Sequence, residues 1–321
     1  MTISLLGHKA AMTILAFRSD TDEFTLWKSE LERLIPQLEV RHYRTDPNPA
    51  EANIVLAWKA PHGAYAAYTG ARLIHSLGAG IDHLLADPQL PVQAAICRLV
   101  DPMLTLRMIE YVALHVLRHH RRHDQLVQQQ QNQIWQQIAA PAARDRTVGV
   151  MGLGALGGAV AISLHNLGFH VQGWSRTAKN LPGIDTFHGT DGLRSFLQKT
   201  EILVCLLPLT EATRDIVNQN LLSQLPRGAR FINAARGHHV VDQDLLAALD
   251  SGHIAEATLD VFRTEPLSTD HPYWRHPRVT VTPHIASLTD PVSAAKVVAD
   301  NIQRLLQGRP LINQVDRTAG Y

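Results

Sequence analysis

Thr147-Val-Gly-Val-Met-Gly-Leu-Gly-Ala-Leu-Gly157 is the stretch that decides the fold of this chain. Its first part, Thr147–Met151, is β-branched and apolar, which predicts a buried strand. Gly152, Gly154 and Gly157 follow with the spacing G-x-G-x-x-G, and small residues behind them predict a helix. A further apolar run predicts the next strand. The stretch therefore predicts a βαβ unit that binds a dinucleotide.

The glycines of this turn have separate roles in such a unit. Gly152 permits the tight turn, Gly154 lets the backbone approach a pyrophosphate, and Gly157 lets the helix lie close to the sheet. Ala155 and Leu156 begin the predicted helix, whose N-terminus favours negative charge. We expect these five residues to form the part of the cofactor-binding site that receives the pyrophosphate.

The end of the second predicted strand, 169–174, bears on the choice of cofactor. An NAD site places Asp or Glu here to bind the ribose hydroxyls, whereas an NADP site places Arg near the 2′-phosphate. This chain has Ser175, Arg176 and Thr177, with Lys179 close behind, and no acidic residue among them. These side chains can donate to a phosphate. The sequence predicts a preference for NADPH over NADH, with a solvated basic turn as the alternative.

Length and composition describe an ordinary globular enzyme. The chain has 321 residues, 45% of them hydrophobic, and a net charge of +1, which suggests two domains and gives no basic field for nucleic acid. Cys97 and Cys205 form neither a disulfide framework nor a zinc pattern, which suits the cytoplasm. No run reaches the length of a membrane span or resembles a signal peptide. We expect residues 1–11 to be a peripheral extension or to follow from an upstream start codon.

Strand and helix patterns alternate on both sides of the glycine turn, which predicts two parallel α/β domains. The fold class is a doubly wound Rossmann domain with a smaller, flavodoxin-like substrate domain. We assign residues 107–284 to the NADP-binding domain, and 1–106 with 285–321 to the substrate domain. Before the turn, strands are expected at 12–17, 54–57 and 73–77, with helices at 23–34, 81–85 and 106–122. After it, strands are expected at 201–207, 229–233, 255–261 and 279–282, with helices at 193–198, 219–225, 243–249 and 293–306.

Two segments of the smaller domain are candidates for binding a small acid. Gly78-Ala79-Gly80 follows a predicted strand, and its backbone N–H groups can form a nest for a carboxylate. A plain turn is an equally good interpretation of those residues. Trp58 follows another strand directly, at the edge where parallel sheets bind ligands. It forms either a wall of the substrate pocket or part of the packing of a surface cleft.

The helix at 106–122 and the segment behind it carry unusual compositions. Ile109, Val112 and Val116 predict its buried stripe together with Ala113 and Leu117. His115, His119 and His123 recur every four residues, a spacing that could bind metal. Because arginines surround them, we interpret this part as a solvated basic helix end, and we expect no metal. The Gln-rich stretch 128–137 is a polar linker or a surface that faces a partner.

Three polar residues follow predicted strands beyond the glycine turn. Arg236 lies in Asn-Ala-Ala-Arg-Gly, Glu265 in Asp-Val-Phe-Arg-Thr-Glu-Pro, and His284 in Thr-Pro-His-Ile-Ala. Reduction of a 2-oxo acid requires a cation for its oxygens and a group that donates a proton near neutral pH. Arg and His meet these two needs. A carboxylate beside His284 would stabilise the protonated ring and orient it, and Glu265 is the candidate.

These segments, in this order, carry a family resemblance. The chain resembles the D-isomer-specific 2-hydroxyacid dehydrogenases over nearly its full length, and within them the bacterial glyoxylate/hydroxypyruvate reductases of the A type. The motifs are the glycine turn, 233–237, 260–266 and 282–284, and the segments 77–82, 174–177 and 315–321 resemble the A-type branch. The segment 101–107 departs from the pattern, because Pro102 and bulky residues stand where relatives have small ones.

The resemblance implies roles that agree with the residue chemistry. Arg236 would bind the substrate carboxylate and carbonyl, His284 would be the general acid, and Glu265 would be its partner. The amides of Ala79 and Gly80 would hold the carboxylate of the substrate. The resemblance also implies a homodimer. Four further residues would contact the cofactor: Leu207, Pro208, Ala234 and, at the nicotinamide, Asp260.

The sequence therefore predicts a cytoplasmic, NADPH-dependent reductase of glyoxylate and hydroxypyruvate, without nucleic-acid or membrane partners. Other 2-hydroxyacid dehydrogenases remain alternatives: one acting on D-lactate, on glycerate in the oxidative direction, or on a bulkier 2-oxo acid. A protein of a different class, a non-catalytic dinucleotide sensor, could use the same fold.

Overall fold

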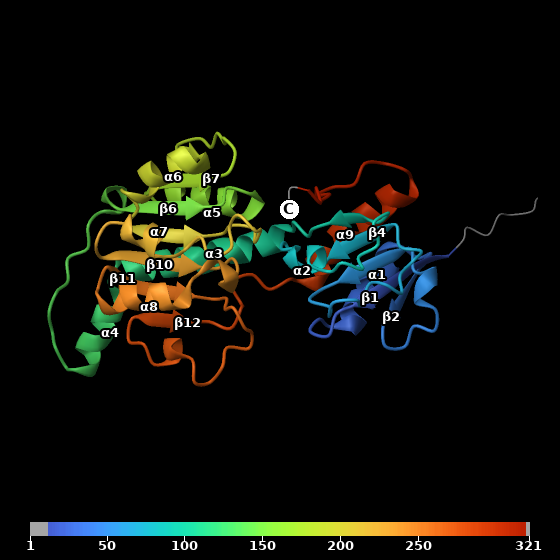
Figure 1. The fold of residues 1–321 in the computed structure, drawn as a ribbon, viewed down its shortest axis with the longest axis horizontal. Coiled ribbons are helices and arrows are strands. Elements are labelled where there is room, and N and C mark those ends of the chain that lie inside the picture. Colours follow the sequence, from blue (N-terminus) through green and yellow to red (C-terminus); the bar gives the residue numbers. More distant parts are fainter. Residues whose placement is uncertain (1–11, 319–321) are drawn as a thin grey trace, which may run out of the picture. The chain divides into compact units, whose positions relative to one another are not determined.

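The computed structural model describes residues 12–318, which form two compact units (Figure 1). Unit 1 comprises the chain up to Met103 and again from Thr289, and unit 2 comprises Leu104–Leu288. The sequence analysis places these two crossings at 106/107 and 284/285. The extension expected at 1–11 lies outside the described residues.

Unit 1 is built on a parallel five-stranded sheet in the order β2-β1-β3-β4-β5. β3 and β4 are buried at every position, which explains the apolar run of β3, whereas β4 also buries two polar residues, His75 and Ser76. Helices α1 and α9 pack against each other, so the last helix of the chain completes the core of the first unit. The elements are β1 (Thr13–Arg18), α1 (Phe24–Leu34), β2 (Leu38–His42), η1 (Pro49–Glu51), β3 (Ile54–Ala57), β4 (Leu73–Ser76), α2 (Asp82–Leu85), β5 (Ala95–Cys97) and α9 (Pro291–Leu306).

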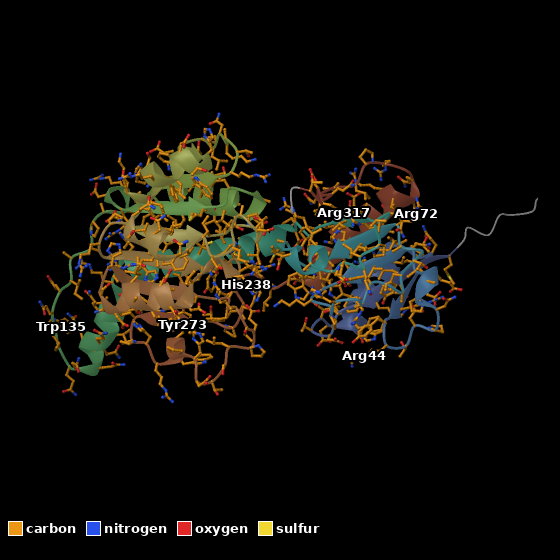
Figure 2. All side chains as sticks on the ribbon, viewed as in Figure 1. Arg44, Arg72, Trp135, His238, Tyr273 and Arg317 are labelled. Carbon is orange, nitrogen blue, oxygen red and sulfur yellow. The ribbon has the colours of Figure 1, made fainter. Side chains whose placement is uncertain are left out.

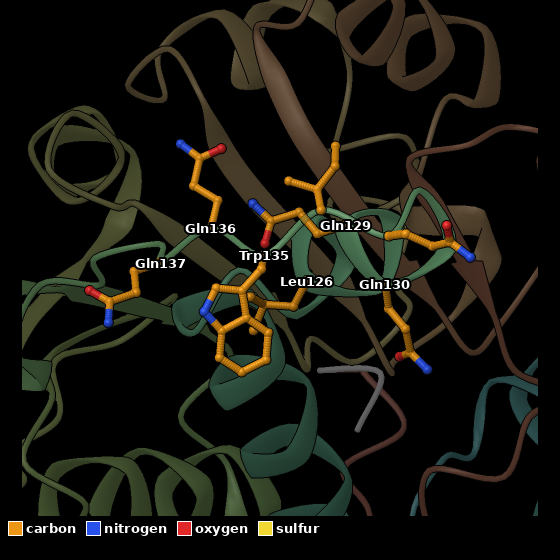
Figure 3. Close-up of a pocket in the computed structure, with 8 residues that line it drawn as sticks. Leu126, Gln129, Gln130, Trp135, Gln136 and Gln137 are labelled. Atoms are coloured by element: carbon orange, nitrogen blue, oxygen red, sulfur yellow. The ribbon is translucent and has the colours of Figure 1, made fainter.

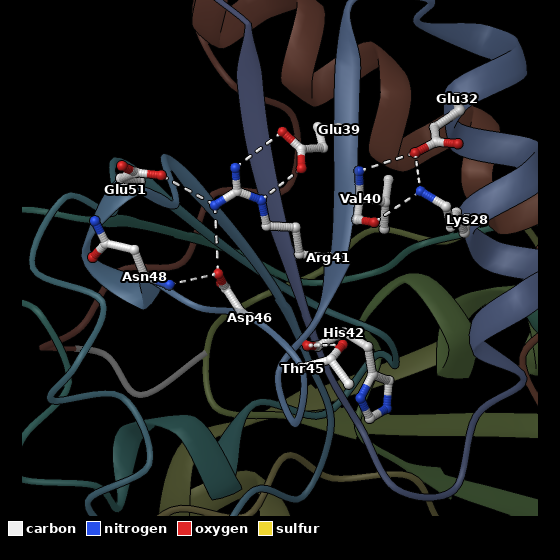
Figure 4. A network of polar contacts seen from close by, with 10 residues as sticks. All are labelled: Lys28, Glu32, Glu39, Val40, Arg41, His42, Thr45, Asp46, Asn48 and Glu51. Carbon is white, nitrogen blue, oxygen red and sulfur yellow. Dashed lines mark hydrogen bonds and ion pairs between the residues drawn. The ribbon is translucent and has the colours of Figure 1, made fainter.

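Strand β2, at the edge of this sheet, is held by charged side chains (Figure 4). The guanidinium of Arg41 donates to both oxygens of Glu39, at 2.8 and 3.0 Å, and to Glu51 at 3.1 Å. On the same strand, Val40 N–H donates to the Glu32 carboxylate and Val40 O accepts from Lys28, both on α1. These contacts fix a strand that the sequence analysis missed.

Unit 2 is built on a parallel seven-stranded sheet in the order β12-β11-β10-β9-β6-β7-β8. The order reverses between β6 and β9, as in a doubly wound fold, so the predicted fold class is confirmed. Its elements are α3 (Pro102–His120), α4 (His123–Gln131), η2 (Ala143–Asp145), β6 (Thr147–Met151), α5 (Ala155–Asn166), β7 (His170–Ser175), β8 (Asp185–His188), α6 (Gly189–Leu197), β9 (Ile202–Cys205), α7 (Gln219–Ser223), β10 (Ala229–Asn233), η3 (Gly237–His239), α8 (Asp242–Asp250), β11 (Ile254–Leu259), η4 (Pro272–Trp274) and β12 (Val279–Val281).

Two hydrophobic clusters cover the two faces of the unit 2 sheet. Neighbouring residues of one strand divide between them: Phe231 packs with Phe196 and Leu245 in one cluster, whereas Ile232 packs with Val112 and Leu164 in the other. α3 and α5 contribute to the second cluster. The glycine turn therefore stands on a sheet that is buried on both faces, which holds its position rigidly.

The interpretation of the end of α3 as a solvated basic region is wrong. His115 and His119 are 5% and 1% exposed, whereas Leu117, expected in the buried stripe, is 40% exposed. His119 reaches the sheet, where its ring nitrogens lie 2.9 Å from the Glu256 carboxylate and 3.0 Å from the Thr258 hydroxyl. The buried stripe of α3 thus continues through both histidines: His119 has polar partners on β11, and the ring of His115 packs against that of Tyr111, with centroids 4.5 Å apart.

The predicted helix at 106–122 also begins too late, since α3 starts at Pro102, a residue type favoured in the first helical turn. The Gln-rich stretch forms the end of α4 and the extended segment after it. No helix among residues 12–318 is long and apolar enough to cross a membrane.

Candidate active site

The glycine turn lies at the switch point of the unit 2 sheet. Gly152 adopts a φ of +102°, and a Cβ added there would stand 2.6 Å from the carbonyl oxygen of Leu206, just beyond β9. A Cβ on Gly157 would stand 1.7 Å from the carbonyl oxygen of Gly152. Both glycines are thus required by the protein itself, for backbone conformation and for close approach of α5.

Gly154 differs from its two neighbours in the motif. Its φ is −76°, and a Cβ added there would meet nothing within 4 Å. The protein therefore gives no internal reason for glycine at the N-cap of α5. A bound ligand would supply the reason for glycine, because a pyrophosphate can approach the bare backbone and the helix N-terminus from this open side. The turn, with Ala155 and Leu156 behind it, fits a dinucleotide.

The end of β7, next to the turn, presents basic and hydroxyl side chains. Gly152 N–H donates to the carbonyl of Trp174, which ties the glycine turn to this strand end. Ser175 is buried and its hydroxyl donates to the carbonyl of Thr177, so it shapes the loop. Arg176, Thr177 and Lys179 are exposed. Their charge and exposure fit a 2′-phosphate at this strand end.

The lining expected for the rest of the cofactor is built from the next two strand ends. Leu207 and Ala234 follow β9 and β10 and are nearly buried, at 7% exposure each. The carbonyl of Pro208 accepts from the hydroxyl of Thr213 at 2.7 Å, which fixes the loop after β9. These residues give the sheet edge an apolar surface beside the glycine turn.

Arg236 is held by the backbone around it. The amide of Asn233 donates to the carbonyl of Arg236 at 3.0 Å, and one guanidinium nitrogen donates to the carbonyl of Ala235. A Cβ on the following Gly237 would lie 1.9 Å from the carbonyl carbon of Phe262. The Arg236 segment therefore packs directly on the loop after β11, three residues before Glu265.

Glu265 and His284 form a pair. Nδ1 of His284 lies 2.7 Å from Oε2 of Glu265, and since a carboxylate only accepts, Nδ1–H donates. The other carboxylate oxygen accepts from Phe262 N–H at 3.1 Å. The side chain of His284 keeps 30% of its surface exposed. The pair therefore leaves Nε2 as the ring atom for exchange of a proton with a ligand.

Asp260, expected at the nicotinamide, supports the loop that carries His284. Its buried carboxylate accepts from the Thr282 hydroxyl at 2.6 Å and from the N–H groups of Ile285 and Ala286 at 2.9 Å each. Its backbone carbonyl accepts from His284 N–H at 2.8 Å. Both carboxylate oxygens thus have partners within the protein.

The substrate residues expected in unit 1 lie at the ends of two neighbouring strands, β3 and β4. Trp58 packs on the turn after β4, since a Cβ on Gly78 would lie 2.5 Å from its ring. The same ring meets His83 edge-on, with centroids 4.8 Å apart. Ala79 and Gly80 are half-buried, and the Gly80 carbonyl accepts from the hydroxyl of Ser76. Trp58 therefore braces the expected carboxylate nest.

Residues 112–286 match the family described as D-isomer specific 2-hydroxyacid dehydrogenase, NAD binding domain. This chain belongs to the D-isomer specific 2-hydroxyacid dehydrogenase family. The family prediction is thereby confirmed. A curated relative from Yersinia enterocolitica, named glyoxylate/hydroxypyruvate reductase A, is 42% identical over 302 residues, which cover 92% of this chain and 96% of the relative.

Solved structures of family members are similar across both units. A D-isomer specific 2-hydroxyacid dehydrogenase from Xanthobacter autotrophicus Py2, in complex with NADPH and MES, has a TM-score of 0.93 and 44% identity, covering 97% of this chain and 100% of that one. An NADPH-dependent glyoxylate/hydroxypyruvate reductase from Sinorhizobium meliloti, in complex with NADP and sulfate, has a TM-score of 0.89 and 36% identity, covering 96% and 100%.

Two other groupings of side chains in this family member lie outside the strand-end site. His119, Asp124 and Glu256 bring ligand atoms within 4.8 Å of one another, but Arg118 binds Asp124 and Arg230 binds Glu256. Arginines therefore already supply the positive charge there. A hollow of about 510 Å³ lies between α4 and the segment after it, lined by Leu126, Gln129, Gln130, Gln133, Ile134, Trp135, Gln136 and Gln137 (Figure 3).

Sequence reasoning missed two residues of the strand-end site, Thr282 and Tyr111. Thr282 lies inside the Thr-Pro-His motif, so the motif gave a signal that was used for His284 alone. Tyr111 gave none, because an aromatic residue on a buried helix face is the common case in any core. Its hydroxyl lies 2.7 Å from that of Thr282, across 171 residues of sequence.

Proposed function

We propose that this chain is an NADPH-dependent reductase that converts glyoxylate to glycolate and hydroxypyruvate to D-glycerate. The observation that carries the proposal is the 2.7 Å contact between His284 Nδ1 and Glu265, on a sheet edge that also carries the glycine turn. The names of the curated relative and of the Sinorhizobium structure support the substrates and the cofactor.

The residues fit a hydride transfer coupled to protonation. Bound NADPH supplies the hydride that the carbonyl carbon of the substrate receives. His284 gives the proton on Nε2 to the carbonyl oxygen, while Glu265 stabilises the charged ring and keeps Nδ1 protonated. Arg236 binds the substrate carboxylate and carbonyl oxygen with its planar guanidinium. In unit 1, the amides of Ala79 and Gly80 would offer donors to a carboxylate.

The cofactor contacts follow from the strand ends of unit 2. Gly152 and Gly154 with the start of α5, which Gly157 lets pack closely, would hold the pyrophosphate, and Arg176 with Thr177 and Lys179 would bind the 2′-phosphate on a loop that Ser175 shapes. Leu207, Pro208 and Ala234 would line the apolar side of the cofactor. Asp260 can contact the nicotinamide only with a lone pair that its own loop leaves available.

Oxidation of NADPH, followed by absorbance, tests the proposal. The purified protein is offered glyoxylate, hydroxypyruvate, pyruvate and a bulkier 2-oxo acid in parallel, with NADH for comparison. Fast turnover of the first two with NADPH is expected. Preference for pyruvate or the bulkier acid would indicate another 2-hydroxyacid dehydrogenase, and NADPH binding without any turnover would indicate a dinucleotide sensor.

Replacement of the acid tests the mechanism. His284→Ala is expected to lower kcat by about 100-fold or more while NADPH binds nearly as before. His170→Ala is the matched control. His170 is half-exposed at the start of β7, at the amino ends of the parallel strands, whereas the site lies at their carboxyl ends. Arg236→Ala is expected to raise KM for glyoxylate and to lower kcat. Unchanged turnover in either site variant would remove that residue from the mechanism.

We also propose that the enzyme works in the cytoplasm as a homodimer. Several large apolar side chains of unit 2 are exposed: Leu114 and Leu117 on α3 are 62% and 40% exposed, and Trp135 is fully exposed. Figure 2 shows Trp135 on the segment after α4, away from the sheet. Such exposed apolar groups are typical of protein interfaces. The two free, buried cysteines suit a reducing compartment.

Light scattering on the purified protein tests the oligomeric state. Twice the chain mass of 35.5 kDa is expected. Trp135→Gln is expected to raise the dissociation constant of the dimer, whereas Trp274→Gln, which removes a half-exposed tryptophan elsewhere on unit 2, is not. A monomer at all concentrations would contradict this proposal.

A further inference from the structure

A chain of hydrogen bonds runs from helix α3 to the loop that carries His284. The Tyr111 hydroxyl lies 2.7 Å from the Thr282 hydroxyl, which lies 2.6 Å from Oδ1 of Asp260. The Asp260 carboxylate then accepts from Ile285 and Ala286, the two residues that follow His284. Every member of this chain belongs to unit 2.

The direction of each bond in the chain is fixed by chemistry. A carboxylate has no proton to give, so the Thr282 hydroxyl donates its only proton to Asp260. Thr282 can therefore only accept from Tyr111, and Tyr111 must be the donor. Burial raises the pKa of Tyr111, which keeps that proton on the phenol. Each donor thus polarises the next hydroxyl toward the carboxylate.

These hydrogen bonds support an unusual backbone conformation at His284. His284 has a φ of +56°, in the left-handed region that side chains with a Cβ rarely adopt. Residues on both sides of it are held by Asp260: Thr282 through its hydroxyl, and Ile285 and Ala286 through their N–H groups. The His284 N–H itself donates to the Asp260 carbonyl at 2.8 Å. The direction in which the imidazole leaves the backbone therefore depends on Asp260 remaining in place.

We propose that Tyr111 and Thr282 are positioning residues for the proton donor His284, acting through the carboxylate of Asp260. The inference rests on the proposed function, because it concerns the acid of that reaction. Thr282 fixes the carboxylate from the strand side, and Tyr111 fixes Thr282 from α3. Without these hydroxyls, the loop keeps its fold but holds the ring of His284 in a wider range of orientations.

Three substitutions separate the two hydroxyls from mere packing. Thr282→Val keeps the shape and removes the hydroxyl, and we expect kcat with glyoxylate to fall about tenfold, equivalent to about 1.4 kcal/mol. Thr282→Ser restores the hydroxyl, and kcat should return to within about twofold of the wild type. Tyr111→Phe removes one buried oxygen, and kcat should fall about threefold, equivalent to about 0.7 kcal/mol.

Thr258→Val is the matched control. Its hydroxyl also ties α3 to the sheet, but it lies within β11 and its partner is His119, at 3.0 Å, rather than Asp260. This variant should lose stability and keep its kcat. In Thr282→Val and Tyr111→Phe, KM for NADPH should stay within about twofold, and the solvent deuterium isotope effect on kcat should rise, because protonation becomes slower relative to the other steps.

The outcomes distinguish the inference from the function on which it rests. A wild-type protein that reduces no 2-oxo acid would overturn the proposed function. An active wild type with unchanged kcat in Tyr111→Phe and Thr282→Val would overturn the positioning role alone. An equal loss in Thr258→Val would also overturn it, since general loosening of α3 would then explain the effect.

Discussion

His75 makes the stability of unit 1 depend on pH in a way that can be calculated. It is fully buried on β4, and the carbonyl of Ser76 accepts from its Nδ1 at 2.8 Å. Nε2 lies 3.2 Å from the amide nitrogen of Asn301 on α9, which must be the donor. The ring is therefore neutral with its proton on Nδ1, because a proton on Nε2 would face the Asn301 NH₂ group.

Burial lowers the pKa of His75 from the ordinary 6.5 to about 4. Above pH 6.5 neither the folded nor the unfolded chain binds this proton, and the stability is unaffected. Between pH 6.5 and 4 the unfolded chain binds it and the folded chain does not. As the pH is lowered through this range, the free energy of unfolding should therefore fall by about 1.4 kcal/mol per pH unit. The total loss from this one residue should be about 3 kcal/mol.

The assay is urea unfolding at a series of pH values from 7 to 4.5, followed by tryptophan fluorescence. His75→Gln, whose amide can both donate and accept, removes the titration, so the slope of stability against pH should become shallower by about 1.4 kcal/mol per unit below pH 6.5. Loss of stability at pH 7 does not affect this slope. His62→Gln is the matched control, because His62 is exposed in the same unit. Parallel slopes in wild type and His75→Gln would refute the reasoning.

Three further predictions concern the cofactor turn, the strand end beside it and the thiols. Gly157→Ala places a Cβ 1.7 Å from a backbone oxygen, so it should lower the free energy of unfolding by roughly 1–3 kcal/mol and weaken NADPH binding. Gly158→Ala, with its nearest contact at 4.0 Å, should be neutral or stabilising. Thermal melts compare the stability of the two variants, and calorimetric titration compares their binding of NADPH. Arg176→Ala should lower the ratio of kcat/KM for NADPH to that for NADH by about tenfold or more, and an unchanged ratio would remove Arg176 from the 2′-phosphate site. Burial raises the pKa of the Cys97 and Cys205 thiols to about 12, so both should resist an aromatic disulfide reagent at pH 7.5 until urea unfolds the protein; fast labelling of the folded protein would contradict their burial.

The sequence predicted the central strands of both sheets because their environment is uniform. β6 and β9 are buried on both faces, so their sequences are short apolar runs that are typical of buried parallel strands. The strands that it missed lie at sheet edges or are very short. β8, Asp-Thr-Phe-His, lies at the edge of its sheet with two exposed residues, and β5 has three residues. Their strand character comes from the neighbouring strand, which is not visible in a local pattern.

The error at the end of α3 has a similar origin. Arginines beside the histidines suggested solvent, because charge is a local property of the sequence. The burial of His119 depends on Glu256 and Thr258, which lie 137 and 139 residues further along the chain. The helical spacing of Met108, Val112 and His115 did place the histidines on the buried face. The pattern could not show that His119 would meet Glu256 and Thr258 there.

The candidate site contains residues that could be predicted from the sequence and residues that could not. Strand ends can be recognised in a sequence, so Arg236, Glu265 and His284 could be named as neighbours of one sheet edge. The contacts that hold the loop of His284 in place could not be predicted in this way. The conformation of His284 depends on Asp260, 24 positions earlier in the numbering, and that carboxylate depends through Thr282 on Tyr111, which lies 171 residues before Thr282. A reacting residue carries its chemistry in its own side chain, whereas a positioning residue acquires its role only from the fold that brings it to its partner.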